Sequence, residues 1–387
     1  FQGGDELERL NYEPFPFDPA SLDAVFLTHA HYDHCGRIPL LVKQGFKGRI
    51  IGTQPTRELT RIVLLDSAKL QKEEYERWQT RSKDMPNGAN FSGEGMAYDQ
   101  RKPLFTEEDV ENVFQFFDVY PYGSSISVNS NVEFRMRDAG HILGSSILEF
   151  WVKTEEGRER KLVFSGDLGQ PGARIIRDPD MIREADYVIC EATYGNRLHK
   201  SKDETILEFL SILKQAQEEK SNVLIPSFAI ERAQEILYEI NLFIENKILQ
   251  NLEVYLDSPM ASKATEIFKQ YPTFYDDDAR RLLEKGDDPF TFPGLVPVES
   301  AEESKRLINK QGVVIMAGSG MCTGGRIVHH IKNNIEKENT QMVFVGYQVE
   351  GTLGRKIVDG QKQIRVMGQD MEVRAKIHTL GGFSAHG

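Results

Sequence analysis

Short apolar runs separated by polar loops dominate the first half of the chain. Runs at 23–28, 132–139, 145–152, 161–167 and 185–192 have the length and the β-branched and aromatic content typical of strands. Residues 56–81 show apolar positions at helical spacing opposite a charged face, which predicts an amphipathic helix. Residues 80–103 carry Gly, Pro, Asn and Ser with little periodicity and predict an exposed loop.

The second half has a different rhythm, in which helical patterns alternate with fully apolar runs. Helices are expected over 205–219 and 231–245, and buried strands within 222–228, 252–258, 312–319 and 341–348. This alternation predicts a mostly parallel sheet covered by helices, extending to about residue 370. The final segment, 371–387, returns to the style of the first half, so the pattern as a whole indicates an α/β protein of two parts.

A dense group of metal-binding residue types follows the first predicted strand, in the stretch THAHYDHCG (28–36). Three of the nine histidines of the chain, His29, His31 and His34, lie here around Asp33. On an extended segment His29 and His31 point the same way, because side chains repeat every second residue. Nitrogen and oxygen donors together suit zinc, with manganese and iron as alternatives. Polar residues that merely end a strand are the competing interpretation, and the density of the group disfavours it.

One cluster of four donors cannot complete two coordination spheres, so other ligands must converge on it. His141 in DAGHILGS and Asp167 in VFSGDLG both lie where a predicted strand ends. Either residue alone would be an ordinary turn residue. Together with the first cluster they predict a site at one edge of a sheet, with Asp167 as a carboxylate able to bridge two ions.

These motifs, with CEATYG (190–195), resemble the metallo-β-lactamase fold. VLIPSFAIERAQEILYEI, VYLDSPMA, MAGSGMCTGGRIVHHI, VGYQVEGTLGR and LGGFSAHG further resemble the β-CASP family of nucleic-acid-processing enzymes. The likeness is greatest to the RNA-cleaving group related to the cleavage-and-polyadenylation endonuclease, and less to ribonuclease J. The resemblance implies an αββα sandwich with an inserted α/β domain, divided as 1–199, 200–370 (β-CASP) and 371–387.

The resemblance also implies residue roles at a dinuclear zinc centre. It assigns the first zinc to His29, His31 and His141, the second to Asp33 and His34, and the bridge to Asp167. The expected catalytic residues are Asp33, Asp167, Glu191 and His386. His386 would protonate the leaving sugar oxygen while the Glu191 carboxylate orients it. The family supplies a further metal-binding histidine downstream of His386, and this sequence ends at Gly387, so we expect a weaker second site here.

RNA contacts are expected at turns that follow the buried strands of the second half. The resemblance favours Ser227, Arg232, Ser319 and Ser384 as contacts to the RNA backbone. From the residues alone, Arg232 could equally pair with Glu231 or Glu235 on a helix surface.

Bulk composition limits the remaining choices. A formal net charge of −12 disfavours a broad nucleic-acid grip without excluding a local one. Three widely spaced cysteines and no apolar run of membrane length predict a cytoplasmic protein without disulfides, in which a homodimer is one assembly to consider. The sequence therefore predicts a zinc-dependent endoribonuclease acting on single-stranded RNA, with 5′-to-3′ exonuclease action as a second mode. A DNA nuclease, a thioester or lactam hydrolase, and a non-catalytic binding subunit remain the alternatives.

Overall fold

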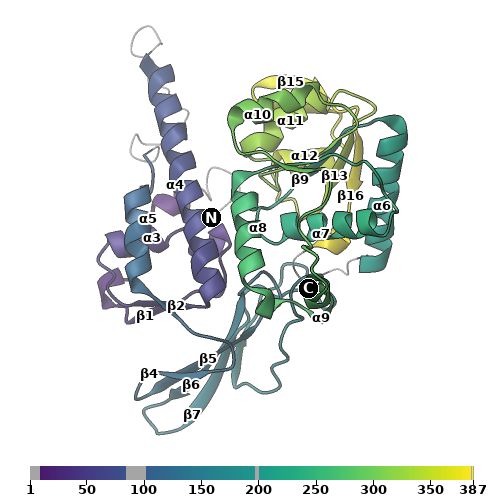
Figure 1. Ribbon diagram of the computed structural model, residues 1–387. Helices are drawn as coiled ribbons and strands as arrows, with labels where there is room; N and C mark the ends of the chain where they lie inside the picture. Colours follow the sequence, from purple (N-terminus) through teal and green to yellow (C-terminus); the bar gives the residue numbers. More distant parts are fainter. Residues whose placement is uncertain (1–8, 84–101, 197–199, 385, 387) are drawn as a thin grey trace.

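The computed structural model describes residues 9–83, 102–196, 200–384 and 386. Two packed sheets form the first part (Figure 1). One is a parallel sheet of β1 (Ala24–Phe26), β2 (Arg49–Gly52) and β3 (Phe117–Val119). The other is a mixed sheet in the order β4 (Ser125–Asn129), β5 (Val132–Asp138), β6 (Ser146–Lys153), β7 (Glu159–Phe164) and β8 (Tyr187–Ile189). The five strands expected in this half are all present.

An apolar layer joins these two sheets face to face. Phe26 and Ile51 of the first sheet pack with Phe134, Met136 and Leu148 of the second. The rings of Phe26 and Phe134 meet edge to face with centroids 4.9 Å apart. Helices cover the other face of the first sheet: α2 (Tyr32–Cys35), α3 (Ile38–Lys43), α4 (Gln54–Lys83) and α5 (Glu107–Val113).

Helix α4 is longer than the sequence pattern indicated. It continues through residues 80–83, where a loop was expected, and residues 84–101 of that expected loop lie outside the described part of the chain. None of the helices in the ranges described above is both long and apolar enough to span a bilayer. The three cysteines are all free, as expected.

A six-stranded parallel sheet forms the second part. Its strand order is β11 (Leu295–Pro297), β10 (Val254–Asp257), β12 (Val314–Ala317), β9 (Val223–Pro226), β13 (Gln341–Phe344) and β16 (Lys376–Thr379). Strands β9, β10, β12 and β13 are buried along their whole length. This burial explains why their sequences are continuous apolar runs rather than alternating ones.

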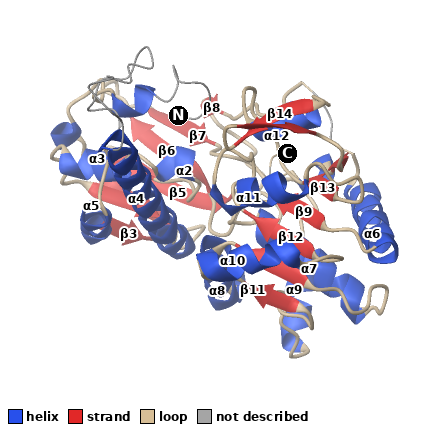
Figure 2. Cartoon of the chain, turned by 90° about the horizontal axis from the view of Figure 1, so that it is seen from above, coloured by secondary structure: helices blue, strands red, loops and turns tan. Residues whose placement is uncertain are grey.

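Helices lie on both faces of this sheet (Figure 2). On one face, Ile225 and Val343 pack with α6 (Lys202–Glu219) and α7 (Arg232–Glu245). On the other, Leu224 and Phe344 pack with α11 (Gly325–Asn334) and α12 (Leu353–Val358). The remaining helices and the antiparallel pair are α8 (Pro259–Gln270), α9 (Asp277–Glu284), α10 (Ala301–Arg306), β14 (Gln363–Val366) and β15 (Gln369–Glu372), and 3₁₀ turns occur at Leu10–Tyr12, Pro19–Ser21, Phe114–Phe116, Pro272–Phe274, Leu307–Asn309 and Gly381–Phe383.

Strand β16 extends this sheet beyond residue 370, where the inserted domain was expected to end. It pairs in parallel with β13, with Gln341 opposite Lys376. The division of the chain at 199 and 370 stays a prediction, but the segment that leads to His386 begins as an edge strand of the six-stranded sheet. The two parts also contact each other directly, as α8 packs against α4 and the Tyr271 hydroxyl donates a 2.5 Å hydrogen bond to Glu58.

Candidate metal centre

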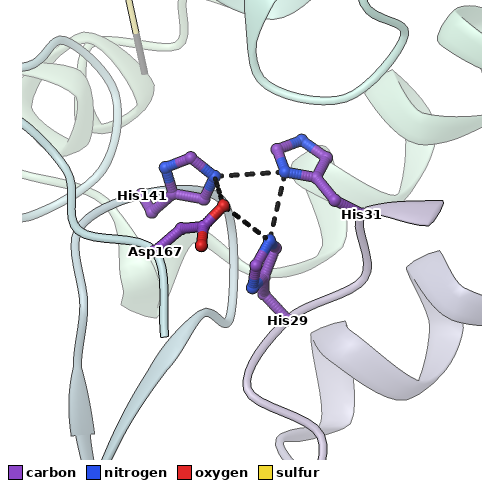
Figure 3. Close-up of side chains that lie close together, drawn as sticks. All are labelled: His29, His31, His141 and Asp167. Atoms are coloured by element: carbon purple, nitrogen blue, oxygen red, sulfur yellow. Dashed lines mark hydrogen bonds and ion pairs between the residues drawn. The ribbon is translucent and has the colours of Figure 1, made fainter. Parts of the chain in front are cut away.

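Three histidines and an aspartate from three loops converge beyond the end of β1 (Figure 3). His29 Nε2 lies 3.2 Å from His31 Nδ1, and His31 Nδ1 lies 3.1 Å from His141 Nε2. Asp167 Oδ2 lies 3.6 Å from both His29 Nε2 and His141 Nε2. Four donors around a zinc ion at 2.0–2.1 Å in a tetrahedron would be about 3.3–3.4 Å apart. Each donor thus has two neighbours near this separation, and all four lie within 4.8 Å of one another, a group compact enough to surround one divalent cation.

The local backbone explains how the ligands reach this point. The main chain at His31 is extended (φ −62°, ψ 147°) before α2 begins, so His29 and His31 share one side as the two-residue spacing predicted. His141 and Asp167 are brought together by their neighbouring glycines. A Cβ placed on Gly169 would lie 1.6 Å from the carbonyl oxygen of Gly140, so only glycine allows these two loops to touch.

The electrostatics of the site favour neutral, metal-binding imidazoles. Burial, together with the neighbouring histidines, lowers the pKa of His29 well below its usual value. Burial also lowers the pKa of His31, to about 4, although Asp33 and Asp167 oppose the change. Neutral imidazole is the form that binds a metal. Thr28 Oγ1 lies 3.1 Å from His29 Nδ1 and can fix the orientation of that ring.

Asp33 and His34 lie on the outer side of the same centre. His34 Nε2 is 3.4 Å from Asp167 Oδ1 and 3.6 Å from Asp33 Oδ2. Burial alone would lower the pKa of His34, but the Asp167 carboxylate raises it overall. Asp167 thus turns Oδ2 toward His29 and His141 and Oδ1 toward His34, and its role as a bridging carboxylate stays a prediction.

The predicted proton donor lies beside this centre although it is distant in sequence. His386 Nδ1 is 3.0 Å from each oxygen of Glu191, and His386 Nε2 is 4.0 Å from Asp167 Oδ2. Burial would raise the pKa of Glu191, but hydrogen bonds from His386, Thr193 and the Leu168 amide outweigh it and lower the pKa to about 2. Glu191 therefore holds the His386 ring by Nδ1, and Nε2 of the same ring faces Asp167.

The four predicted RNA-contact residues have different surroundings. Ser227, Arg232 and Ser384 are buried, whereas Ser319 is half-buried and its hydroxyl accepts hydrogen bonds from the Thr323 and Gly324 amides. The Arg232 guanidinium donates to Glu235 and to the carbonyl of Phe383. Its side chain therefore anchors the segment that carries His386, an arrangement the local sequence does not indicate.

Comparison with known proteins agrees with this architecture. The Beta-Casp domain family matches residues 233–357, and the Metallo-beta-lactamase superfamily matches residues 5–125. Ribonuclease TTHA0252 of Thermus thermophilus is 38% identical over 387 residues, covering 100% of this chain and 81% of that protein. The chain belongs to the β-CASP family of the metallo-β-lactamase superfamily.

Two archaeal relatives extend the comparison. The RNase J-like protein of Methanocaldococcus jannaschii is 30% identical, with 96% of this chain and 77% of that protein covered. Transcription termination factor FttA of Methanococcus maripaludis is 32% identical over 99% of this chain, but the chain spans only 57% of its length. These relatives place the chain in the β-CASP ribonuclease family, which is a family of hydrolases. The His/Asp cluster is the candidate metal site of this chain.

Sequence reasoning assigned no role to Tyr194, whose ring lies near His386. The motif CEATYG contains this residue, but nothing in the motif indicates what the ring would face.

Proposed function

We propose that this β-CASP protein is a zinc-dependent endoribonuclease that hydrolyses phosphodiester bonds of single-stranded RNA. The observation that carries the proposal is that Asp167 lies next to two groups of residues. One is the cluster of His29, His31 and His141, and the other is the Glu191–His386 pair. Phosphodiester hydrolysis needs both an activated water and a proton for the departing oxygen.

The residues of the site divide these tasks. Asp33, His34, Asp167 and the three other histidines would hold two divalent cations, which when bound supply a water of lowered pKa and positive charge beside the phosphoryl oxygens. His386 would donate its proton to the leaving sugar oxygen through the ring nitrogen that faces Asp167. Glu191 holds the opposite nitrogen and keeps the ring in place.

The choice of RNA rests on the relatives, two of which are named as a ribonuclease and an RNase J-like protein. The deciding experiment incubates the zinc-loaded chain with 5′-labelled RNA and DNA single strands of the same sequence. We expect internal cuts in RNA alone, and release of the label as a single 5′ mononucleotide would reveal the exonuclease mode as well. Equal or faster cutting of DNA, or turnover of a thioester without any cutting of nucleic acid, would overturn the proposal. Light scattering of the same preparation would test the predicted homodimer.

A further inference from the structure

Two tyrosines from different parts of the chain meet beside the proposed proton donor. The Tyr194 and Tyr347 rings are 5.8 Å apart between centroids and nearly perpendicular, at 87°. The Tyr194 ring is also 6.4 Å from the His386 ring. Tyr194 follows β8 by five residues, and Tyr347 follows β13 by three. The two rings therefore stand next to the site without belonging to the metal cluster.

The sheet topology explains why Tyr347 reaches this place. Strands β13 and β16 are parallel neighbours, so the segments after both strands leave the same edge of the sheet. One of these segments carries Tyr347 and the other carries His386. Tyr194 belongs to the segment after β8, three residues after Glu191, the partner of His386.

These rings are at least partly accessible, in contrast to Phe383 at the same edge. Tyr347 is 37% exposed and Tyr194 is half-buried. Phe383 is fully buried and packs edge-on against Phe209, with ring centroids 5.7 Å apart. The Phe228 ring lies against Gly320 and Gly346, where a Cβ on either glycine would approach it within 3.3 Å or less. Phe383 thus supports the fold, and Phe228, although half-buried as Tyr194 is, packs against backbone, whereas the Tyr347 ring is exposed and adjoins Tyr194.

The negative charge around the site would repel RNA, so contacts to RNA that do not depend on charge would be important here. The net charge of the chain is −12, and Asp33, Asp167 and Glu191 line the centre itself. The nearby cation Arg355 is engaged by Asp359, at 2.9 Å from both carboxylate oxygens. Stacking of a nucleobase on an aromatic ring does not depend on charge and tolerates any base sequence.

We propose that Tyr194 and Tyr347 form a stacking site for the nucleobase next to the scissile phosphate. The inference rests on the proposed nuclease function and adds to it a reason for single-strand selectivity. A base stacked on the exposed Tyr347 ring, beside Tyr194, cannot remain stacked and paired in a duplex. Single-stranded RNA offers such a base without the cost of unpairing it.

The test combines tyrosine variants with RNA that lacks one base. A single abasic nucleotide is moved stepwise through the positions around the cut, and kcat and KM are measured for the unmodified chain, Tyr194→Leu, Tyr194→Phe, Tyr347→Leu and Tyr347→Phe. Tyr75→Leu is the matched control, because Tyr75 also belongs to an aromatic pair, with Trp78 at 5.9 Å, but lies on α4. We expect each Leu variant to raise KM about 5- to 150-fold. The Phe variants and the control should stay within about threefold of the parent, which is under 1 kcal/mol.

At one abasic position the KM of the unmodified chain should rise by the same factor as in the Leu variants. The KM of the Leu variants should not rise further at that position. If the effects of the tyrosine substitution and of the missing base on KM multiply at every position, the proposal is overturned, because the rings and the base then act independently. So would a fall in kcat at constant KM, which would mean that Tyr194 only positions His386. A preparation that neither binds nor cuts RNA would instead overturn the proposed nuclease function itself.

Discussion

Replacing Glu191 by Gln tests the proposed proton donor most directly. Gln keeps the shape of the side chain and an oxygen that can accept from the Leu168 amide, at 2.6 Å in the parent. It removes the negative charge that faces His386 Nδ1. The change therefore removes the carboxylate charge beside the His386 ring while leaving the candidate metal ligands unchanged.

The expected size follows from the hydrogen bonds of this carboxylate. The pKa of Glu191 falls from an ordinary 4.5 to about 2 against the effect of burial, with His386, Thr193 and the Leu168 amide sharing the cause. A single hydrogen bond to a charged group contributes about 1.5–3 kcal/mol. Loss of the share that belongs to His386 should lower kcat by about 10- to 150-fold.

The assay compares two RNA substrates that differ in one atom. In the first, the leaving oxygen at a defined bond is natural, and in the second it is replaced by sulfur, whose thiolate leaves without a proton because its pKa is near that of cysteine, about 8.5. Glu191→Gln should cut the natural substrate slowly and the sulfur substrate at nearly the parental rate. Equal defects on both substrates would refute the proton-donor role, and an altered metal content would show instead that the centre was damaged.

Other perturbations address the metal, the fold and the anchoring of His386. Asp167→Ala should release bound metal and lower cutting by more than about 100-fold, checked by elemental analysis and the RNA assay; retained metal would exclude a bridging role. Glu149, 2% exposed among three cations, has its pKa lowered to about 2 by hydrogen bonds that overcome burial. Glu149→Gln should therefore lower the free energy of unfolding in urea by about 2–3 kcal/mol at pH 7. This difference should persist above pH 4.5 and shrink as the pH falls toward 2, because the parental carboxylate is then protonated. A difference that does not change with pH would contradict this reasoning. Arg232→Met should destabilise the chain by about 3–5 kcal/mol and lower kcat, with partial rescue by Arg232→Lys; unchanged stability would show that the bond to Phe383 is unimportant.

Local sequence was sufficient for nine of the strands in the described part of the chain and for the proximity of His29 and His31, but not for the short strands β2, β3, β4, β11, β14, β15 and β16. The two-residue spacing of His29 and His31 requires nothing beyond an extended backbone, which the structure has at His31. The placement of His141 and Asp167 at strand ends also followed from short apolar runs. Their convergence was an inference from the number of ligands needed, and the contact between Gly140 and Gly169 that produces it could not be read from either loop alone.

Contacts between distant segments were beyond the sequence. Helix α7 buries Arg232, Gln234, Glu235 and Glu239, which in a sequence indicate a solvated helix face. Arg232 is buried because its partner, the Phe383 carbonyl, arrives from 151 residues away. Strand β16 similarly joins β13 by a pairing that the polar sequence of its segment does not indicate. The exposure of aromatic residues could not be predicted either, because the residue type alone does not reveal that Tyr347 is exposed and Phe383 buried.

The position of His386 after an edge strand of the six-stranded sheet has a mechanical consequence. The candidate metal ligands lie on loops of the first part, whereas the proposed proton donor follows a strand of the second part. A rigid-body separation of the two parts by a few ångströms would withdraw the donor and leave the cation cage assembled. Such an opened form would keep the candidate metal ligands together but would be inactive. An RNA strand bound to both parts would then bring His386 back beside Asp167.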